Sequence, residues 1–316
     1  MSLTRTLEAV ETRARLLAPV DLTTRLDRFQ YQFDGNAVRA LPFGGGQPLL
    51  LHDLALRQLA SRVQVPIDYL KRCPKNLADL NLGYWTQQTP VRRESLFRTI
   101  QGNQVRSIHT DSYQPFDDVD VLPLVAEALG DDEVQVQLFN QDDNYTHLRL
   151  VFPRMVAEAR PGDYLYGAIH ISNSETGLRS VQISSLVYRL VCTNGLVRPE
   201  TTSKVAARHI GNPARMRDFI ANAVREAKLG TVRLVEEFKA SVHRTLEEPL
   251  KLIERTAAEG SLTQEQFQRI LTSFATEGDT TLYGAINAFT HAAQAEPTVE
   301  ARYQMERTGA QLLRLV

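Results

Sequence analysis

The spacing of apolar residues changes once along the chain, and this change constrains the fold more than any other sequence feature. Between residues 133 and 172 apolar side chains alternate with polar ones, as at Val134 and Val136. A period of two is typical of strands with one buried face. Between residues 216 and 242 the apolar residues recur every third or fourth position, which indicates a helix. The sequence therefore predicts an α+β fold, in which antiparallel β-hairpins packed with helices precede a helical C-terminal region.

Length and composition limit the number of domains and the compartment. With 316 residues and 43% hydrophobic content, the chain can form one large core or two smaller ones. We predict an α+β core domain over residues 1–202 and a helical region over residues 203–316. Two cysteines cannot make a disulfide framework or a four-cysteine zinc site. Since no signal peptide or run of roughly 20 apolar residues is present, we expect a cytoplasmic protein that does not enter a membrane.

Two hairpins and a third pair of strands are expected before residue 185. Residues 96–109 contain a central Gly-Asn pair suited to a two-residue turn, and regular pairing there would point Arg98 and Arg106 to opposite faces. Residues 133–152 predict a second hairpin with one apolar and one hydrogen-bonding face. Residues 164–172 predict a strand that residues 177–184 follow in the antiparallel direction.

The segment after Ser185 has two interpretations. Its apolar spacing becomes helical, and the Asn-Gly pair at residues 194–195 suits a helix C-cap, but an extended strand through Cys192 is also possible. Arg189 lies inside this apolar run, so we expect it to pair with a carboxylate or with backbone carbonyls.

Helices are expected on both sides of this central region. Residues 52–63 and 67–72 predict two short helices separated by a proline. Pro213 follows an asparagine at the start of a helix of eight or nine turns. Thr263 and Gln266 have the spacing of a capping box at the start of a later helix.

Charged residues are segregated along the chain. Residues 62–106 carry eight Lys/Arg and three Asp/Glu, residues 111–145 carry ten acidic and no basic residues, and residues 179–233 carry ten basic and three acidic ones. Two basic zones around an acidic one are typical of polyanion binders. Solvated faces that simply differ in sign explain the pattern as well.

The first basic zone contains a candidate nucleic-acid site. Single-strand binders combine cations along the phosphates with aromatic faces on which bases stack. The Tyr84-Trp85 pair lies between a Lys-Arg pair at residues 71–72 and the pair Arg92-Arg93. The alternative is that Trp85, the only tryptophan, anchors the core while Tyr84 is exposed.

The second basic zone contains further candidates. Arg198, Lys204 and Arg208 lie in a polar segment rich in Thr and Ser, where a loop that grips phosphates is expected. Tyr166, on the strand over residues 164–172, is a second candidate for stacking on a base. We therefore expect phosphate contacts from Arg92, Arg93 and these three residues.

Enzymatic motifs are missing from the sequence. None of the seven histidines has the spacing of a zinc hydrolase or deaminase, and no nucleophile elbow occurs. The acidic clusters could bind magnesium for phosphoryl chemistry, although such clusters more commonly cap helices: Asp117, Asp118 and Asp120, and Asp131, Asp132 and Glu133. We expect a non-enzymatic protein without a cofactor. A metal-dependent nuclease or phosphoryl-transfer enzyme is one alternative, and a protein-binding scaffold or regulator is another.

The segment at residues 188–196, which reads YRLVCTNGL, resembles the R-x-V/L-C-x-N-x-L signature of a phage and plasmid family known as domain of unknown function 932. The tail TLYGAINAFT at residues 281–290 fits this resemblance, which covers roughly residues 40–310. The resemblance implies an α+β fold and a role in mobile-element DNA metabolism. The order of helices and hairpins is also similar to that of RecT/Redβ-type annealing proteins. We therefore expect a homo-oligomer that binds single-stranded DNA in preference to RNA, with strand annealing as a further activity to test.

Overall fold

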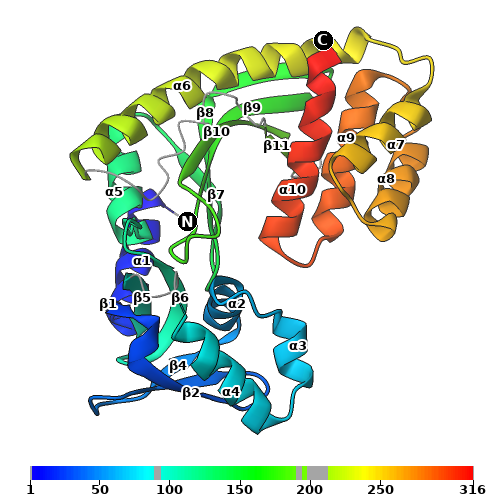
Figure 1. Cartoon of the computed structure of the whole chain (residues 1–316). Coiled ribbons are helices and arrows are strands. Elements are labelled where there is room, and N and C mark those ends of the chain that lie inside the picture. The colour runs from blue at the N-terminus through cyan, green and yellow to red at the C-terminus, as the bar shows by residue number, and fades with distance from the viewer. Residues whose placement is uncertain (1, 89–93, 190–193, 198–212, 316) are drawn as a thin grey trace.

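The computed structural model describes residues 2–88, 94–189, 194–197 and 213–315, and it confirms the α+β fold. Two sheets lie one beyond the other, and a group of helices covers the second sheet (Figure 1). The first sheet has the strand order β1-β5-β6-β4-β3-β2, and only β4 and β6 pair in parallel. Its strands are β1 (Val20–Arg25), β2 (Phe29–Phe33), β3 (Val38–Pro42), β4 (Leu49–Leu51), β5 (Glu94–Ile100) and β6 (Gln104–Thr110).

Three helices follow β4; the first and the third contact the first sheet, and the second packs against the first. They are α2 (Asp53–Arg62), α3 (Ile67–Arg72) and α4 (Lys75–Thr86), so the two short helices expected over residues 52–72 are confirmed. Leu56 and Leu59 of α2 are fully buried against Phe97 of β5 and the neighbouring strands. A core of this kind fixes the orientation of all three helices, because each buries one apolar stripe.

The β5–β6 hairpin is confirmed, but the expectation that its two arginines diverge is wrong. A β-bulge shifts the register, so that Arg98 pairs with Ser107 whereas Thr99 pairs with Val105. Arg106 is the extra residue, and a bulge redirects the side chains beside it. Both Arg98 and Arg106 consequently reach the same residue, Glu175.

The second sheet has the order β11-β10-β9-β8-β7 and is antiparallel throughout. It confirms the second hairpin and the strand expected over residues 164–172. Its strands are β7 (Gln135–Gln141), β8 (Thr146–Arg160), β9 (Asp163–Asn173), β10 (Gln182–Arg189) and β11 (Asn194–Val197).

The helical interpretation of the segment after Ser185 is wrong. The chain remains extended to Arg189, and residues 194–197 return as a strand in which Gly195 pairs with Tyr188. Leu186 and Val187 are both buried, on opposite faces of β10. A strand buried on both faces has a continuous apolar run, and such a run cannot be told from a helix by its spacing.

Helices cover both faces of the second sheet. The apolar face packs against α1 (Leu3–Leu17), α5 (Asp118–Leu129) and the long helix α6 (Pro213–Ala240), through residues such as Leu150 and Ile169. The 28 residues of α6 make about eight turns, as expected. The face expected to carry hydrogen-bonding residues is buried as well, because α10 (Val299–Ala310) packs on it.

The C-terminal helices form a compact group beside α6 (Figure 1). They are α7 (Pro249–Glu259), α8 (Gln264–Glu277), α9 (Leu282–Ala292) and α10, and a short 3₁₀ helix (Gln311–Leu315) follows. Almost every residue of α9 is buried, so this helix is the centre of the group. The capping box of Thr263 and Gln266 is confirmed at the start of α8. None of the helices within the described residues is both long and apolar enough to cross a membrane.

Candidate functional site

Helix α4 exposes two aromatic side chains next to each other. Its inner face is fixed by Ala78, Leu82 and Thr86, which recur every four residues and are fully buried. Tyr84 and Trp85 do not belong to this inner face, and their side chains are 57% and 43% exposed, respectively. Their ring centroids lie 5.1 Å apart in an edge-to-face arrangement. The interpretation of Trp85 as a core anchor is wrong, whereas the exposure of Tyr84 is as expected.

Three cations surround the junction of α3 and α4. Lys71 and Arg72 end α3, Lys75 begins α4, and all three side chains are exposed. In the described part of the chain, no ion pair joins them to a carboxylate. The nearby Asp79 accepts a hydrogen bond from the backbone N–H of Phe33 and forms no ion pair with these cations among the described residues. We call Lys71, Arg72, Lys75, Tyr84 and Trp85 the α3–α4 surface.

Most of the other candidate residues are not among those that the structure describes. Arg92, Arg93, Arg198, Lys204 and Arg208 lie outside the described residues. Tyr166 lies on β9, half-buried against Tyr188 and Tyr303, and lines a cavity of about 500 Å³. Figure 1 shows α4 and the upper part of the second sheet at opposite ends of the molecule, so Tyr166 is not part of the α3–α4 surface.

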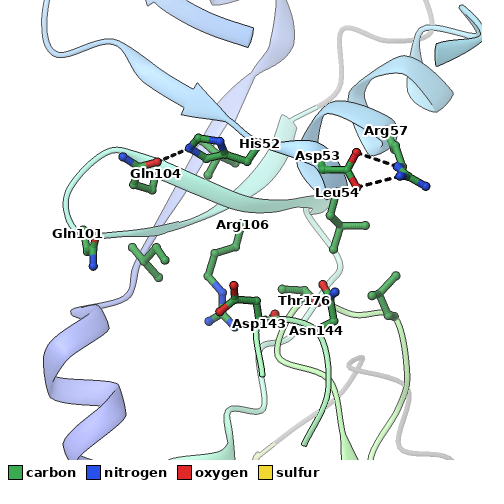
Figure 2. Close-up of a pocket in the computed structure, with 13 residues that line it drawn as sticks. His52, Asp53, Leu54, Arg57, Gln101, Gln104, Arg106, Asp143, Asn144 and Thr176 are labelled. Carbon is green, nitrogen blue, oxygen red and sulfur yellow. Dashed lines mark hydrogen bonds and ion pairs between the residues drawn. The ribbon is translucent and has the colours of Figure 1, made fainter. Parts of the chain in front are cut away.

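A larger pocket, of about 530 Å³, lies between the first sheet and the loops of the second (Figure 2). Four segments line it: the start of α2, residues 100–106 of the β5–β6 hairpin, the β7–β8 loop and the loop before β10. Its charged groups come from the first three segments, and its apolar walls come from α2, the hairpin and the last loop. The lining residues are His52, Asp53, Leu54, Arg57, Ile100, Gln101, Gln104, Val105, Arg106, Asp143, Asn144, Thr176 and Leu178.

The sequence does not predict this pocket, because its residues are up to 126 positions apart. The only local signal was a group of amide residues near two turns, Gln101 and Gln104 in one and Asn144 in the other. Turn residues of this type are common without any binding role.

A buried ionic network lies beside the pocket. The Arg98 side chain is 5% exposed and donates to both oxygens of Asp117, at 2.6 and 2.7 Å, and to Asp21 at 3.0 Å. Arg106 donates to Glu175 Oε2 at 2.8 Å. The network joins the first sheet to the loops of the second, and its close, multiple contacts offset the cost of burying these charges.

Asp118 lies at the edge of this network, next to Glu175. It is fully buried and accepts hydrogen bonds from Gln141, Thr146 and Asn173. Burial raises its pKa to about 6, and the nearby Glu175 carboxylate adds to the shift. Glu175, rather than the N-cap residue Asp117, accepts the backbone N–H of Asp118 at the start of α5.

The acidic clusters considered for magnesium take part in ion pairs and hydrogen bonds. Asp117 pairs with Arg98, and in the second cluster Asp132 pairs with Lys228 and Glu133 with Arg154. Within the described residues, no group of three or more His, Cys, Asp or Glu side chains could hold a metal ion.

A second polar network lies between the second sheet and α10. Arg149 donates to Glu306 of α10 at 3.2 Å and to His170 Nδ1 at 3.2 Å, and all three side chains are buried. His170 Nε2 lies 3.1 Å from His147 Nδ1, and His147 Nε2 lies 3.0 Å from Glu300. His170 Nδ1 accepts from Arg149, so the proton of His170 is assigned to Nε2, which faces His147 Nδ1. The proton of His147 is then assigned to its Nε2, on the side of Glu300. Burial, followed by the charge of Arg149, lowers the pKa of His170 well below its usual value.

The same network holds Arg179 between two aromatic rings. Its guanidinium lies 5.1 Å from the ring centre of Tyr145 and 5.0 Å from that of Tyr303, and it pairs with Glu300. Burial raises the pKa of Glu300, but hydrogen bonds from His147 and Arg179 outweigh it and lower the pKa to about 2. This arrangement joins α10 to the sheet and to the loop before β10.

Arg189 behaves as the sequence predicts. Its Nε donates to Asp163 Oδ1 at 2.8 Å, and Asp163 also accepts from the hydroxyl of Tyr283 on α9. The arginine of the signature segment therefore has a structural role at the junction of the sheet and the C-terminal helices.

Comparisons with known proteins identify one family. A model described as a domain of unknown function (DUF932) matches residues 107–313, a later start than the expected residue 40. No curated protein and no solved structure matches the chain. The α3–α4 surface precedes the matched segment. Because the match covers well over half of the 316 residues, the chain belongs to the DUF932 family.

Proposed function

We propose that the protein binds single-stranded DNA through the α3–α4 surface. The observation that carries this proposal is the exposure of Tyr84 and Trp85 beside three exposed cations that form no ion pair within 4.0 Å of a carboxylate among the described residues. Stacking of one base on an aromatic side chain is worth about 1–3 kcal/mol and tolerates any base sequence. The cations supply phosphate contacts, whose contribution decreases as salt rises.

Five arginine and lysine residues outside the described part of the chain are proposed as further phosphate contacts. Arg92 and Arg93 follow α4 by a few residues in the sequence and would lengthen the cationic track. Arg198, Lys204 and Arg208 are proposed as a second phosphate-binding segment. The strand is bound without chemical conversion, and homo-oligomerisation and strand annealing are further parts of the proposal.

The test is a fluorescence polarisation titration with labelled single- and double-stranded oligonucleotides at two salt concentrations. Replacing both Tyr84 and Trp85 with alanine is expected to weaken single-strand binding at least about 30-fold, since two stacks are lost. Replacing Lys71, Arg72 and Lys75 with alanine is expected to reduce the slope of log affinity against log salt by about 2. A triple replacement of Arg198, Lys204 and Arg208 tests the second segment.

A matched control removes three exposed cations elsewhere. Lys239, Lys251 and Arg255 lie near the C-terminal helices, far from α4 in Figure 1, and their replacement by alanine changes net charge by the same amount. An unchanged salt slope in the α3–α4 variant, or an equal loss in the control, overturns the proposed site. Failure of the wild-type protein to bind any strand at low salt overturns the function.

A protein-binding scaffold is the second candidate. Leu80 is 66% exposed and Leu77 39% exposed on α4, beside the aromatic pair. Exposed apolar residues in a group are typical of protein-binding surfaces. If single strands do not bind, whereas replacement of Leu77 and Leu80 with serine abolishes self-association measured by light scattering, this second function is supported.

A further inference from the structure

We propose that the pocket of Figure 2 receives one nucleobase of the bound strand, with adenine preferred. The inference rests on the proposed binding of single strands, and it adds a site that reads the base rather than the backbone. Three properties of the pocket support it: its size and walls, the pairing of its charges, and its amide side chains.

The pocket has the size and the walls of a small-ligand site. Its volume of about 530 Å³ lies within the roughly 300–1,000 Å³ that is usual for such sites. Leu54, Ile100, Val105 and Leu178 supply apolar surface, and they come from three of the four lining segments. A flat apolar ring is the kind of group that such walls hold by contact.

The charged groups of the pocket are paired with one another or with near neighbours. Arg57 and Asp53 make a two-pronged ion pair at 2.9 and 3.1 Å, drawn in Figure 2. Arg106 pairs with Glu175, and Asp143 pairs with Arg13 at 2.9 Å. A phosphate at these arginines would meet the negative charge of the carboxylates that already pair with them, whereas a neutral ring would not. The charge pattern therefore favours a base over a phosphate group.

Amide side chains supply the polar groups. Gln101, Gln104 and Asn144 each carry a donor and an acceptor, and Gln104 uses its oxygen toward His52. Within the described part of the chain, Gln101 and Asn144 make no side-chain hydrogen bond that would occupy them. An amide can bind adenine through two hydrogen bonds at N6 and N7.

The backbone holds one of these amides in place. Gln101 has a φ of +50° at the β5–β6 turn, and its N–H donates to the carbonyl of Leu17 at 2.8 Å. Such a conformation is uncommon for a residue other than glycine and persists only where the surroundings impose it. The side chain therefore starts from a fixed position at the rim of the pocket.

Helix α2 links the pocket to the α3–α4 surface. Its first residues line the pocket, and its last turn leads through residues 63–66 into α3. The 10 residues of α2 span about 15 Å, a distance that a strand of a few nucleotides covers. A strand held at α3 can thus place one base in the pocket.

The experiment compares oligonucleotides of dA, dT and dC of equal length with the full-length protein. The wild-type protein is expected to prefer dA by about tenfold, in line with about 1–3 kcal/mol for a good amide–base pair. Two variants test the pocket: Gln101→Ala combined with Asn144→Ala removes the amides, and Leu178→Trp fills the volume. Both are expected to bind all three oligonucleotides with the affinity that the wild type shows for dT.

The control is Gln64→Ala, because Gln64 is exposed and has a similar φ of +56°, so the same backbone strain is introduced outside the pocket. A preference for dA that survives in both pocket variants overturns the inference, as does equal binding of the three oligonucleotides by the wild type. Ligand-observed NMR with free adenosine separates the two proposals. A saturation-transfer signal lost in Leu178→Trp supports the pocket even if strands do not bind, whereas no signal together with no strand binding overturns both.

Discussion

Asp118 gives the sharpest prediction for stability, since it is a fully buried carboxyl whose pKa is raised rather than lowered. Replacement with asparagine keeps its shape and removes its charge. The hydroxyl of Thr146 and the amide of Gln141 can each turn to accept from the new NH₂ group, while the oxygen still accepts from Asn173. We expect the variant to fold as the wild type does and to differ from it in pH dependence.

The magnitude follows from the shift of the pKa from 3.8 to about 6 on folding. Because the folded state holds this proton more tightly, the free energy of unfolding of the wild type falls as pH rises from about 4 to about 6. One pKa unit corresponds to about 1.4 kcal/mol, so the full effect is about 3 kcal/mol. In Asp118→Asn this loss does not occur, and the variant gains about that amount relative to the wild type on going from acid to neutral pH.

The assay is urea unfolding of both proteins between about pH 4 and about pH 7.5, where about 2.5 kcal/mol of the effect falls. The quantity compared is the difference between the two free energies of unfolding at each pH, which cancels all other titrating groups. Asp131→Asn controls for the loss of one exposed negative charge. A difference that stays constant over this range would show that Asp118 is not protonated in the folded protein near pH 5, and would refute the reasoning.

Two other substitutions test the packing of the network and of a tight turn. Arg98→Met is expected to lower the free energy of unfolding in urea by about 3–5 kcal/mol, because the largely buried Asp117 keeps its charge and loses its partner. Arg57→Met, in an exposed ion pair, should lower it by less than about 1 kcal/mol. Equal losses would contradict the assigned burial. Gly177→Ala is expected to lower stability more than Gly102→Ala, measured by thermal unfolding. Both glycines have positive φ (+75° and +84°), but only at Gly177 does a Cβ meet another side chain, 2.5 Å from His109 Cε1, and similar losses would count against that contact.

Local patterns in the sequence predict several elements of the fold correctly, although they do not predict β1–β4 and α4. The hairpin over residues 96–109, the long helix after Pro213 and the capping box at Thr263 each depend on signals within a few residues. The pairing of Arg189 with a carboxylate also follows from its position in an apolar run, although the partner, Asp163, could not be named. Elements whose causes are local are therefore predictable from the sequence.

Errors arise where distant contacts decide the outcome. The bulge between Arg98 and Thr99 is not visible in the composition of the hairpin, yet it brings two arginines to one glutamate. The part of β10 after Ser185 has helical spacing because both faces of the strand are covered, one by α6 and the other by Tyr303 of α10. Trp85 is exposed because Ala78, Leu82 and Thr86 already form the inner face of its helix. The candidate pocket depends on four separate segments and is invisible to any local pattern.

The ionic network at Arg98 crosses the N-terminal boundary of the segment that matches the family model. The matched segment begins at residue 107, so Asp117 and Glu175 fall inside it while their partners Arg98 and Arg106 fall outside. A fragment cut at the family boundary would carry two acidic side chains deprived of their counter-charges, along with one strand of a sheet whose neighbours were removed. The segment that matches the family model is therefore not expected to fold on its own with the same contacts. A piece of this chain that begins at residue 107 would need other counter-charges for Asp117 and Glu175.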